Sequence, residues 1–389
     1  MKRLLDFVFV FLLLVYPFIN MLPDDFMIFG TIWGIVATLF VLLVLLVKKK
    51  AINRYAISAF LISIFIFISI LLSNEITFLK FVTGYKYILP FLLASYIYWY
   101  PLDEKKIHII YKILFIYLIL MIALFLYRLS YVDFNLFMVT MKKDFVWYDN
   151  KSHNFAQMYI LLCVSFLFFS YLLKKNIYIA YIFFLPIFFV GVRSVILATL
   201  LFLIILSTLM VKSYLKAILA FFFIFLSLAI VQPDFKKLTP LILSAQDANR
   251  GEDKMTFTSM SSGRDIILDY YMKELDPEKI FVGSGMQFLE TNSDFKLGLH
   301  NDTLEFFFSF GIFGLFALIF GLYYSIFYDA YKKTHGINRL FIVALIFLFF
   351  GISNFAFFIY NQLIIYFYIL IFIVKNYQIP RNGLMYENQ

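Results

Sequence analysis

Residues 26–47, with the sequence FMIFGTIWGIVATLFVLLVLLV, contain no charged side chain. A helix of about 20 apolar residues is long enough to cross the hydrocarbon layer of a membrane. The rest of the chain has a similar character, because 63% of the 389 residues are hydrophobic and 15% are charged, whereas soluble domains contain about 25% charged residues. The sequence therefore predicts an all-α polytopic membrane protein.

Comparable apolar runs recur along the whole chain and predict about 12 transmembrane helices. The first run follows Lys2 and Arg3, but no small-x-small cleavage pattern comes after it, so we interpret it as a retained helix. The predicted spans lie near residues 4–20, 26–47, 55–72, 78–99, 107–127, 154–173, 177–192, 194–211, 214–231, 303–328, 339–357 and 359–374.

The 33 basic and 24 acidic residues report orientation in such a protein and do not indicate nucleic-acid binding. With the N-terminus in the cytoplasm, 18 Lys and Arg residues fall in cytoplasmic loops and 15 outside, of which 8 belong to the long segment 232–299. Long loops do not follow the positive-inside rule. Without the segment 232–299, 7 Lys and Arg residues lie outside and 18 lie inside. This difference predicts that both termini are cytoplasmic.

Three regions follow from this topology: helices over 1–231, a large extracytoplasmic loop over 232–299, and helices with a short tail over 300–389. The loop has the composition of soluble protein, with 11 acidic and 8 basic residues in 68 positions. A second outer loop, near 128–153, begins with Arg128. We therefore expect any chemistry on the outer face.

Arg264 lies within a predicted helix start in the large loop. Ser262 and Asp265 fit a capping box, which places Arg264 in a first helical turn, where free N–H groups favour an anion. A phosphate site is one interpretation, and a surface arginine on an ordinary amphipathic helix is the other. The glycines of 283–285 lack the pattern of a dinucleotide-binding loop and predict a structural turn.

Arg193 stands between two apolar runs with almost no linker. An arginine at mid-membrane costs at least ~2.5–3.5 kcal/mol, so such residues usually face a cavity or a partner. The planar guanidinium can clamp a phosphate with two hydrogen bonds. The alternative is an interfacial arginine that snorkels to the membrane surface.

His300 precedes the tenth predicted span, whose first residues include Asn301 and Glu305. The positive end of a helix disfavours imidazolium and keeps a neutral imidazole available as a base. The alternative is a polar residue that caps the helix. No metal-binding pattern is present, and the single cysteine, Cys163, forms neither a disulfide nor a metal cluster within the chain.

Several short motifs occur in an order that resembles the O-antigen polymerase and O-antigen ligase superfamily. The resemblance covers residues 185–325 by motif and the rest by hydropathy, and its motifs are Arg193-Ser194, Ser262-Gly263-Arg264, His300-Asn301 and Gly311-Ile312-Phe313-Gly314-Leu315. It implies about 12 helices in a C-type glycosyltransferase arrangement. It also implies metal-independent, inverting transfer from undecaprenyl-diphosphate-linked oligosaccharides at the outer face of the bacterial inner membrane, without a cofactor.

The resemblance assigns Arg193 and Arg264 to the donor diphosphate and His300 to activation of the acceptor hydroxyl. Secondary candidates around this site are Arg128, Arg250, Asn301 and Glu305. Trp147, Tyr270 or Tyr271 are candidates for sugar-stacking surfaces.

The leading function is polymerisation of lipid-linked repeat units into O-antigen or capsular polysaccharide, with membrane lipids and a chain-length regulator as expected partners. A ligase that transfers glycan to lipid A core shares the motifs and the topology. A flippase or transporter fits the span count, but transport folds place ionisable groups near the midplane, whereas here charges gather at the ends of the predicted spans. A non-catalytic membrane scaffold is disfavoured, because such a protein does not require these motifs.

Overall fold

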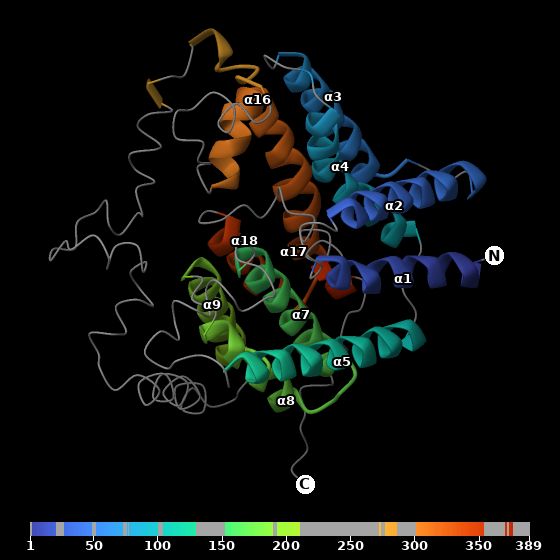
Figure 1. Ribbon diagram of the computed structural model, residues 1–389, viewed down its shortest axis with the longest axis vertical. Helices are drawn as coiled ribbons and strands as arrows, with labels where there is room; N and C mark the ends of the chain where they lie inside the picture. Colours follow the sequence, from blue (N-terminus) through green and yellow to red (C-terminus); the bar gives the residue numbers. More distant parts are fainter. Residues whose placement is uncertain are drawn as a thin grey trace, which may run out of the picture.

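The computed structural model shows a protein built of helices (Figure 1). No strand occurs among the residues that the structure describes. These residues are 2–20, 27–48, 52–72, 76, 78–99, 104–129, 152–189, 193–210, 272–273, 277–285, 301–353, 370–371 and 373–375.

The helices coincide with most of the predicted apolar runs. Those of the first half are α1 (Lys2–Asn20), α2 (Met27–Lys48), α3 (Arg54–Leu72), α4 (Phe78–Trp99), α5 (Glu104–Leu129) and α7 (Ser152–Leu172). Those of the second half are α8 (Ile177–Ile182), the 3-10 helix η2 (Leu185–Phe189), α9 (Arg193–Met210), the 3-10 helix η4 (Pro277–Lys279), α16 (Asp302–Leu318), the π-helix η5 (Ile319–Tyr328), α17 (Asp329–Lys333) and α18 (Gly336–Ser353).

In the described part of the chain, 4 helical stretches are long and apolar enough to cross a membrane. The longest extends through α16, η5 and α17. The four stretches are Ile28–Leu46, Arg54–Leu72, Lys105–Ala123 and Thr303–Lys333. The predicted span at 214–231, and most of the one at 359–374, lie outside the described residues.

The region predicted as a span at 177–192 has a different form. It consists of the 6-residue α8 followed by the 5-residue 3-10 helix η2. Pro186 lies within η2, and a proline lacks the backbone N–H that a continuing α-helix needs at that position. The apolar run therefore does not form one continuous helix here.

The spatial arrangement of the helices differs from their order along the chain. Figure 1 shows α3 beside α4 and α16, while α2 packs on the other side of α4. The helix α1 contacts both α2 and α5, and α7 contacts both α5 and α9. The helices α9 and α18 meet at small residues, since a Cβ atom on Gly351 would lie 2.8 Å from the Cβ atom of Ala198. Close approach at small residues is typical of membrane helices.

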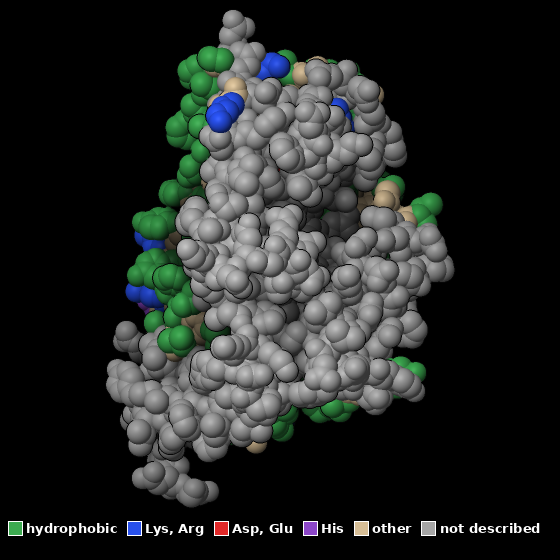
Figure 2. Space-filling model, turned by 60° about the vertical axis from the view of Figure 1, so that its left-hand side comes forward, with side chains coloured by type: hydrophobic (Ala, Val, Ile, Leu, Met, Phe, Trp, Pro, Cys, Tyr) green, Lys and Arg blue, Asp and Glu red, His purple; other side chains and the backbone are tan. Residues whose placement is uncertain are grey.

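The described surface and interior have the polarity expected in lipid. Large apolar side chains such as Leu46 (79% exposed), Phe60 (65%) and Phe316 (63%) face outward, and Figure 2 shows hydrophobic side chains gathered along one edge of the molecule. Ser69 and Ser95, by contrast, are fully buried. Buried polar groups are tolerated between membrane helices because neighbouring backbone or side-chain groups satisfy them.

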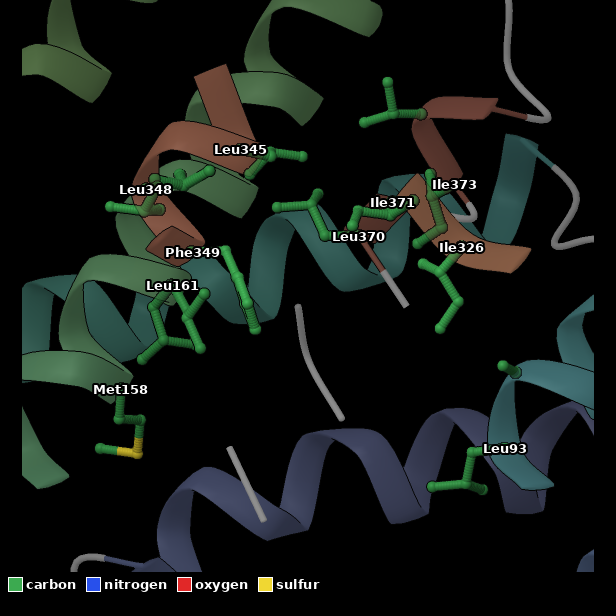
Figure 3. Close-up of a cluster of buried hydrophobic side chains, with 14 of the residues drawn as sticks. Leu93, Met158, Leu161, Ile326, Leu345, Leu348, Phe349, Leu370, Ile371 and Ile373 are labelled. Carbon is green, nitrogen blue, oxygen red and sulfur yellow. The ribbon is translucent and has the colours of Figure 1, made fainter. Parts of the chain in front are cut away.

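Apolar side chains from several described helices form an interior cluster (Figure 3). Leu345, Leu348 and Phe349 of α18 point into it, as does Leu161 of α7. The C-terminal residues 370–375 add apolar side chains, and the Asn338 amide donates a hydrogen bond of 2.6 Å to a carbonyl of this segment. This contact holds the end of the described chain against α18.

Candidate functional site

The N-terminus of α16 is fixed by its own cap. The backbone of Asn301 is extended, and its Oδ1 accepts a hydrogen bond of 3.1 Å from the N–H of Leu304. The carbonyl of Asn301 also accepts the N–H of Glu305 at 2.9 Å. Asparagine is among the preferred N-cap residues. Residue 300 therefore directly precedes the positive end of a defined helix.

A break interrupts α16 at Gly311, nine residues after its start. The backbone angles of Gly311 are φ 66° and ψ −167°, which no helix contains. The break leaves backbone groups of the helix without their usual partners. A segment of the region predicted to form the large outer loop supplies the replacements.

Residues 277–285, which we call the strap, form backbone hydrogen bonds with both sides of this break. The N–H groups of Ile312 and Phe313 donate to the carbonyls of Ile280 (2.9 Å) and Phe281 (3.2 Å). The N–H groups of the strap donate in return, from Ser284 to Phe308 (2.8 Å) and from Gly285 to Ser309 (3.2 Å). The strap therefore repairs the hydrogen bonding that the break removes.

Glycine is required at both sides of this contact. Gly283 and Gly285 have φ values of 82° and 100°, in the region that side chains disfavour. A Cβ atom on Gly311 would lie 2.5 Å from the amide nitrogen of Gly283, and a Cβ atom on Gly283 would lie 2.5 Å from the amide nitrogen of Phe310. The glycines of 283–285 follow turn residues at 280–282, and their role in the structure is close backbone packing.

The N-terminal half of α16 is also held by α3 and α4. The hydroxyl of Ser69 in α3 donates a buried hydrogen bond of 2.9 Å to the carbonyl of Ser309. The ring of Tyr87 in α4 meets Phe306 and Phe310 edge-on, with centroid distances of 5.3 Å and 6.0 Å. Three separate elements therefore position the helix that follows residue 300.

The structure describes only part of the predicted site. Arg193 is the first residue of α9, and Arg128 lies in the last turn of α5, but their side chains are outside the described part. Asn301 and Glu305 lie in the cap and first turn of α16 and are partly buried. The remaining predicted site residues, Arg250, Arg264, His300, Trp147, Tyr270 and Tyr271, lie outside the described residues, as does the capping box at 262–265.

A charged cluster lies at the opposite end of the α16–α17 stretch. The Asp329 carboxylate, 8% exposed, accepts contacts from Arg54 Nη1 (2.6 Å) and Lys333 Nζ (3.2 Å) and from the ammonium of Lys375. Lys375 also donates to the hydroxyl of Tyr55 at 3.0 Å. Three cations around one carboxylate join the start of α3, α17 and the end of the described chain.

A second charged contact joins α1 to α4 and α5. Asp6, 2% exposed, forms an ion pair with Lys106, and the Tyr96 hydroxyl donates to Asp6 Oδ1 at 3.3 Å. Buried charges are stable only when they are paired and hydrogen-bonded. Both clusters therefore hold the helix ends in a defined arrangement.

These contacts had partial signals in the sequence. Asp6 and Asp329 are isolated acidic residues beside apolar runs, which suggests that each has a cationic partner. Sequence alone does not identify the partner, because Lys106 and Lys375 are far away along the chain. For the contact between Gly283 and Gly311, the two glycines themselves were the only indication in the sequence.

In the described part of the chain, no three His, Cys, Asp or Glu side chains gather where they could hold a metal ion. No protein-family model and no curated protein matches the sequence. The fold and the described contacts define a class: a helical protein with several candidate membrane-spanning helices, in which a segment from outside the helices repairs a broken one.

Proposed function

We propose that the chain is a membrane glycosyltransferase that polymerises oligosaccharide units carried on undecaprenyl diphosphate, at the outer face of the bacterial inner membrane. The order of Arg193, Arg264 and His300 along the sequence supports this activity. The observation that carries most weight is the N-cap of α16 by Asn301. The expectation of a neutral imidazole at His300, the form a general base requires, depends on such a helix start.

The proposed reaction needs a base and positive charge. His300 accepts the proton of the acceptor sugar hydroxyl while its oxygen attacks the anomeric carbon of the donor. The bond from that carbon to the diphosphate oxygen breaks, and the configuration inverts. Arg193 and Arg264 offset the negative charge that develops on the departing diphosphate. The two arginines take the role that a metal ion has in other transferases.

The proposed topology places both termini in the cytoplasm. The contacts at Asp329 and Asp6 support it, because they join Arg54, Lys375 and Lys106, all of which the count of basic residues assigns to the cytoplasmic side. Residue 300 then belongs to the outer side. This is the side on which lipid-linked oligosaccharides are available to a polymerase.

The proposal is tested by variants in a strain that lacks the gene. We expect His300→Ala and Arg264→Ala to abolish long-chain polysaccharide while the protein is still inserted in the membrane. The matched control is His335→Ala, because His335 is exposed and lies near Arg339, at the end remote from the strap. Normal chain ladders from both site variants would contradict the proposal.

A ligase gives a different result in the same strain. If the chain transfers finished glycan to lipid A core, the site variants leave a bare core and lipid-linked polymer accumulates. If it polymerises, they leave a core carrying a single repeat unit. A transporter predicts accumulation of single lipid-linked units on the cytoplasmic side.

A further inference from the structure

The strap belongs to the loop that the sequence assigns to the aqueous exterior, yet its apolar side chains are exposed. Phe281 is 56% exposed and Val282 is 37% exposed. Phe281 contacts Phe313 of α16, with ring centroids 5.9 Å apart. Phe313 (48% exposed) and Phe316 (63%) are themselves surface residues of the stretch Thr303–Lys333. The strap therefore extends the exposed apolar surface of a candidate membrane span.

The position of the strap along the spans follows from contacts between α3 and the α16–η5 stretch. The hydroxyl of Ser69 meets the carbonyl of Ser309, and Ser58 meets Ser325 at 3.4 Å. The two helical stretches therefore run antiparallel. Ser69 is three residues from the end of α3 at Leu72, which places the level of Ser309 about 5 Å inside that end.

Phe313 lies further inside than Ser309, because η5 and α17 continue towards Ser58 and Arg54. It follows Thr303, the first residue of the candidate span, by ten residues. The carbonyl of Phe281 accepts the N–H of Phe313 at 3.2 Å. Phe281 is therefore level with the apolar length of α3 and α16, and not with their ends.

Four backbone groups of the strap are paired with α16, as irregular structure at this depth requires. Non-helical backbone occurs inside membranes only where its polar groups are satisfied by protein or by a water-filled cavity. The carbonyls of Ile280 and Phe281 and the N–H groups of Ser284 and Gly285 all pair with α16. Lys279 is exposed at the start of this stretch, and its flexible stem allows the ammonium to reach the membrane surface.

We propose that the strap is a re-entrant membrane segment, in which Phe281 and Val282 contact lipid acyl chains of the outer leaflet beside Phe313. The inference rests on α3 and α16 crossing the membrane and is independent of the proposed catalytic chemistry. Water-exposed placement would leave the contacting rings of Phe281 and Phe313, together with Val282 and Phe316, exposed to water instead of lipid. The large loop is then attached to the membrane through the strap as well as through its two ends.

The test uses single-cysteine variants of the full chain reconstituted in phosphatidylcholine–phosphatidylglycerol vesicles. Cys163, the only cysteine, is first replaced by alanine. Nitroxide labels at Phe281→Cys, Phe313→Cys and Lys332→Cys are then compared by power saturation with oxygen, which concentrates in hydrocarbon, and with a water-soluble nickel chelate. Position 313 reports the membrane span, and the exposed Lys332 reports the aqueous boundary.

We expect the label at 281 to be more accessible to oxygen than to nickel, as at 313, and opposite to 332. A label at 281 that behaves like the one at 332 overturns the inference. If 313 also shows aqueous values, the crossing of α16 is wrong and the inference falls with it. Val282→Cys serves the same purpose if Phe281→Cys does not fold.

Discussion

Gly283 and Gly311 lie against each other, so that a Cβ atom on Gly311 would be 2.5 Å from the amide nitrogen of Gly283. The two residues belong to different regions of the chain, one to the strap and one to α16. Their contact places the strap inside the break of a helix and satisfies backbone groups on both sides. The strap therefore positions the helix that follows residue 300 along the chain.

Alanine at Gly311 or Gly283 is expected to destabilise the protein by at least about 2 kcal/mol. The cost combines a left-handed backbone with a clash against backbone atoms that cannot move aside. Thermal unfolding in detergent, followed by size-exclusion chromatography, measures the loss. Gly336→Ala is the matched control, because Gly336 has φ 54° but no atom within 4 Å of its added Cβ, and we expect a cost of only ~1 kcal/mol there.

The helix positions follow from the sequence because charges and apolar runs alternate clearly along it. The bounds of α2, α3, α4 and α9 agree with the predicted runs within two residues. Hydropathy does not report how a helix is broken, so the break at Gly311 and the π-helix η5 were not predicted. Both depend on contacts with α3 and the strap.

The candidate site was predicted as a set of residues rather than as a geometry. The sequence identified Asn301 and Glu305 beside a helix start, and the structure confirms that helix start. The roles of Arg193, Arg264 and His300 remain predictions, because they depend on side chains outside the described residues. The strap was not predicted to contact α16, since a backbone contact leaves no periodic pattern.

Replacing Asp329 by asparagine is expected to lower the free energy of unfolding by about 3–5 kcal/mol, because removal of one partner leaves buried charge without compensation. Arg54 and Lys375 would then face each other without the carboxylate that separates them. Lys333→Ala provides the contrast: this side chain is 52% exposed, and exposed ion pairs contribute less than about 1 kcal/mol. Equal losses for the two variants would contradict a buried role for Asp329.

The ion pair between Asp6 and Lys106 predicts strong coupling in a double-mutant cycle. Asp6→Leu alone is expected to cost about 3 kcal/mol or more, since it leaves Lys106 charged in a partly buried position. The double variant Asp6→Leu/Lys106→Met is expected to recover most of this loss, because an apolar pair of similar volume replaces the ions. Additive losses would show that the two residues do not interact.

Arg193→Lys is expected to reduce polymerisation roughly 10- to 100-fold without preventing membrane insertion, because lysine cannot give two parallel hydrogen bonds to a phosphate. The assay is chain formation in membranes supplied with lipid-linked oligosaccharide. Arg339→Lys tests the same exchange at the end remote from the strap, where Arg339 Nε donates to the carbonyl of Thr334 at 2.8 Å. Wild-type activity in Arg193→Lys would favour the interfacial anchor.

Polymerisation of lipid-linked repeat units is tested by the glycan ladder of a strain that lacks the gene. We expect lipid core carrying one repeat unit and no longer chains, with the ladder restored by the wild-type gene but not by His300→Ala. A bare core with lipid-linked polymer would indicate a ligase, and an unchanged ladder would exclude both activities.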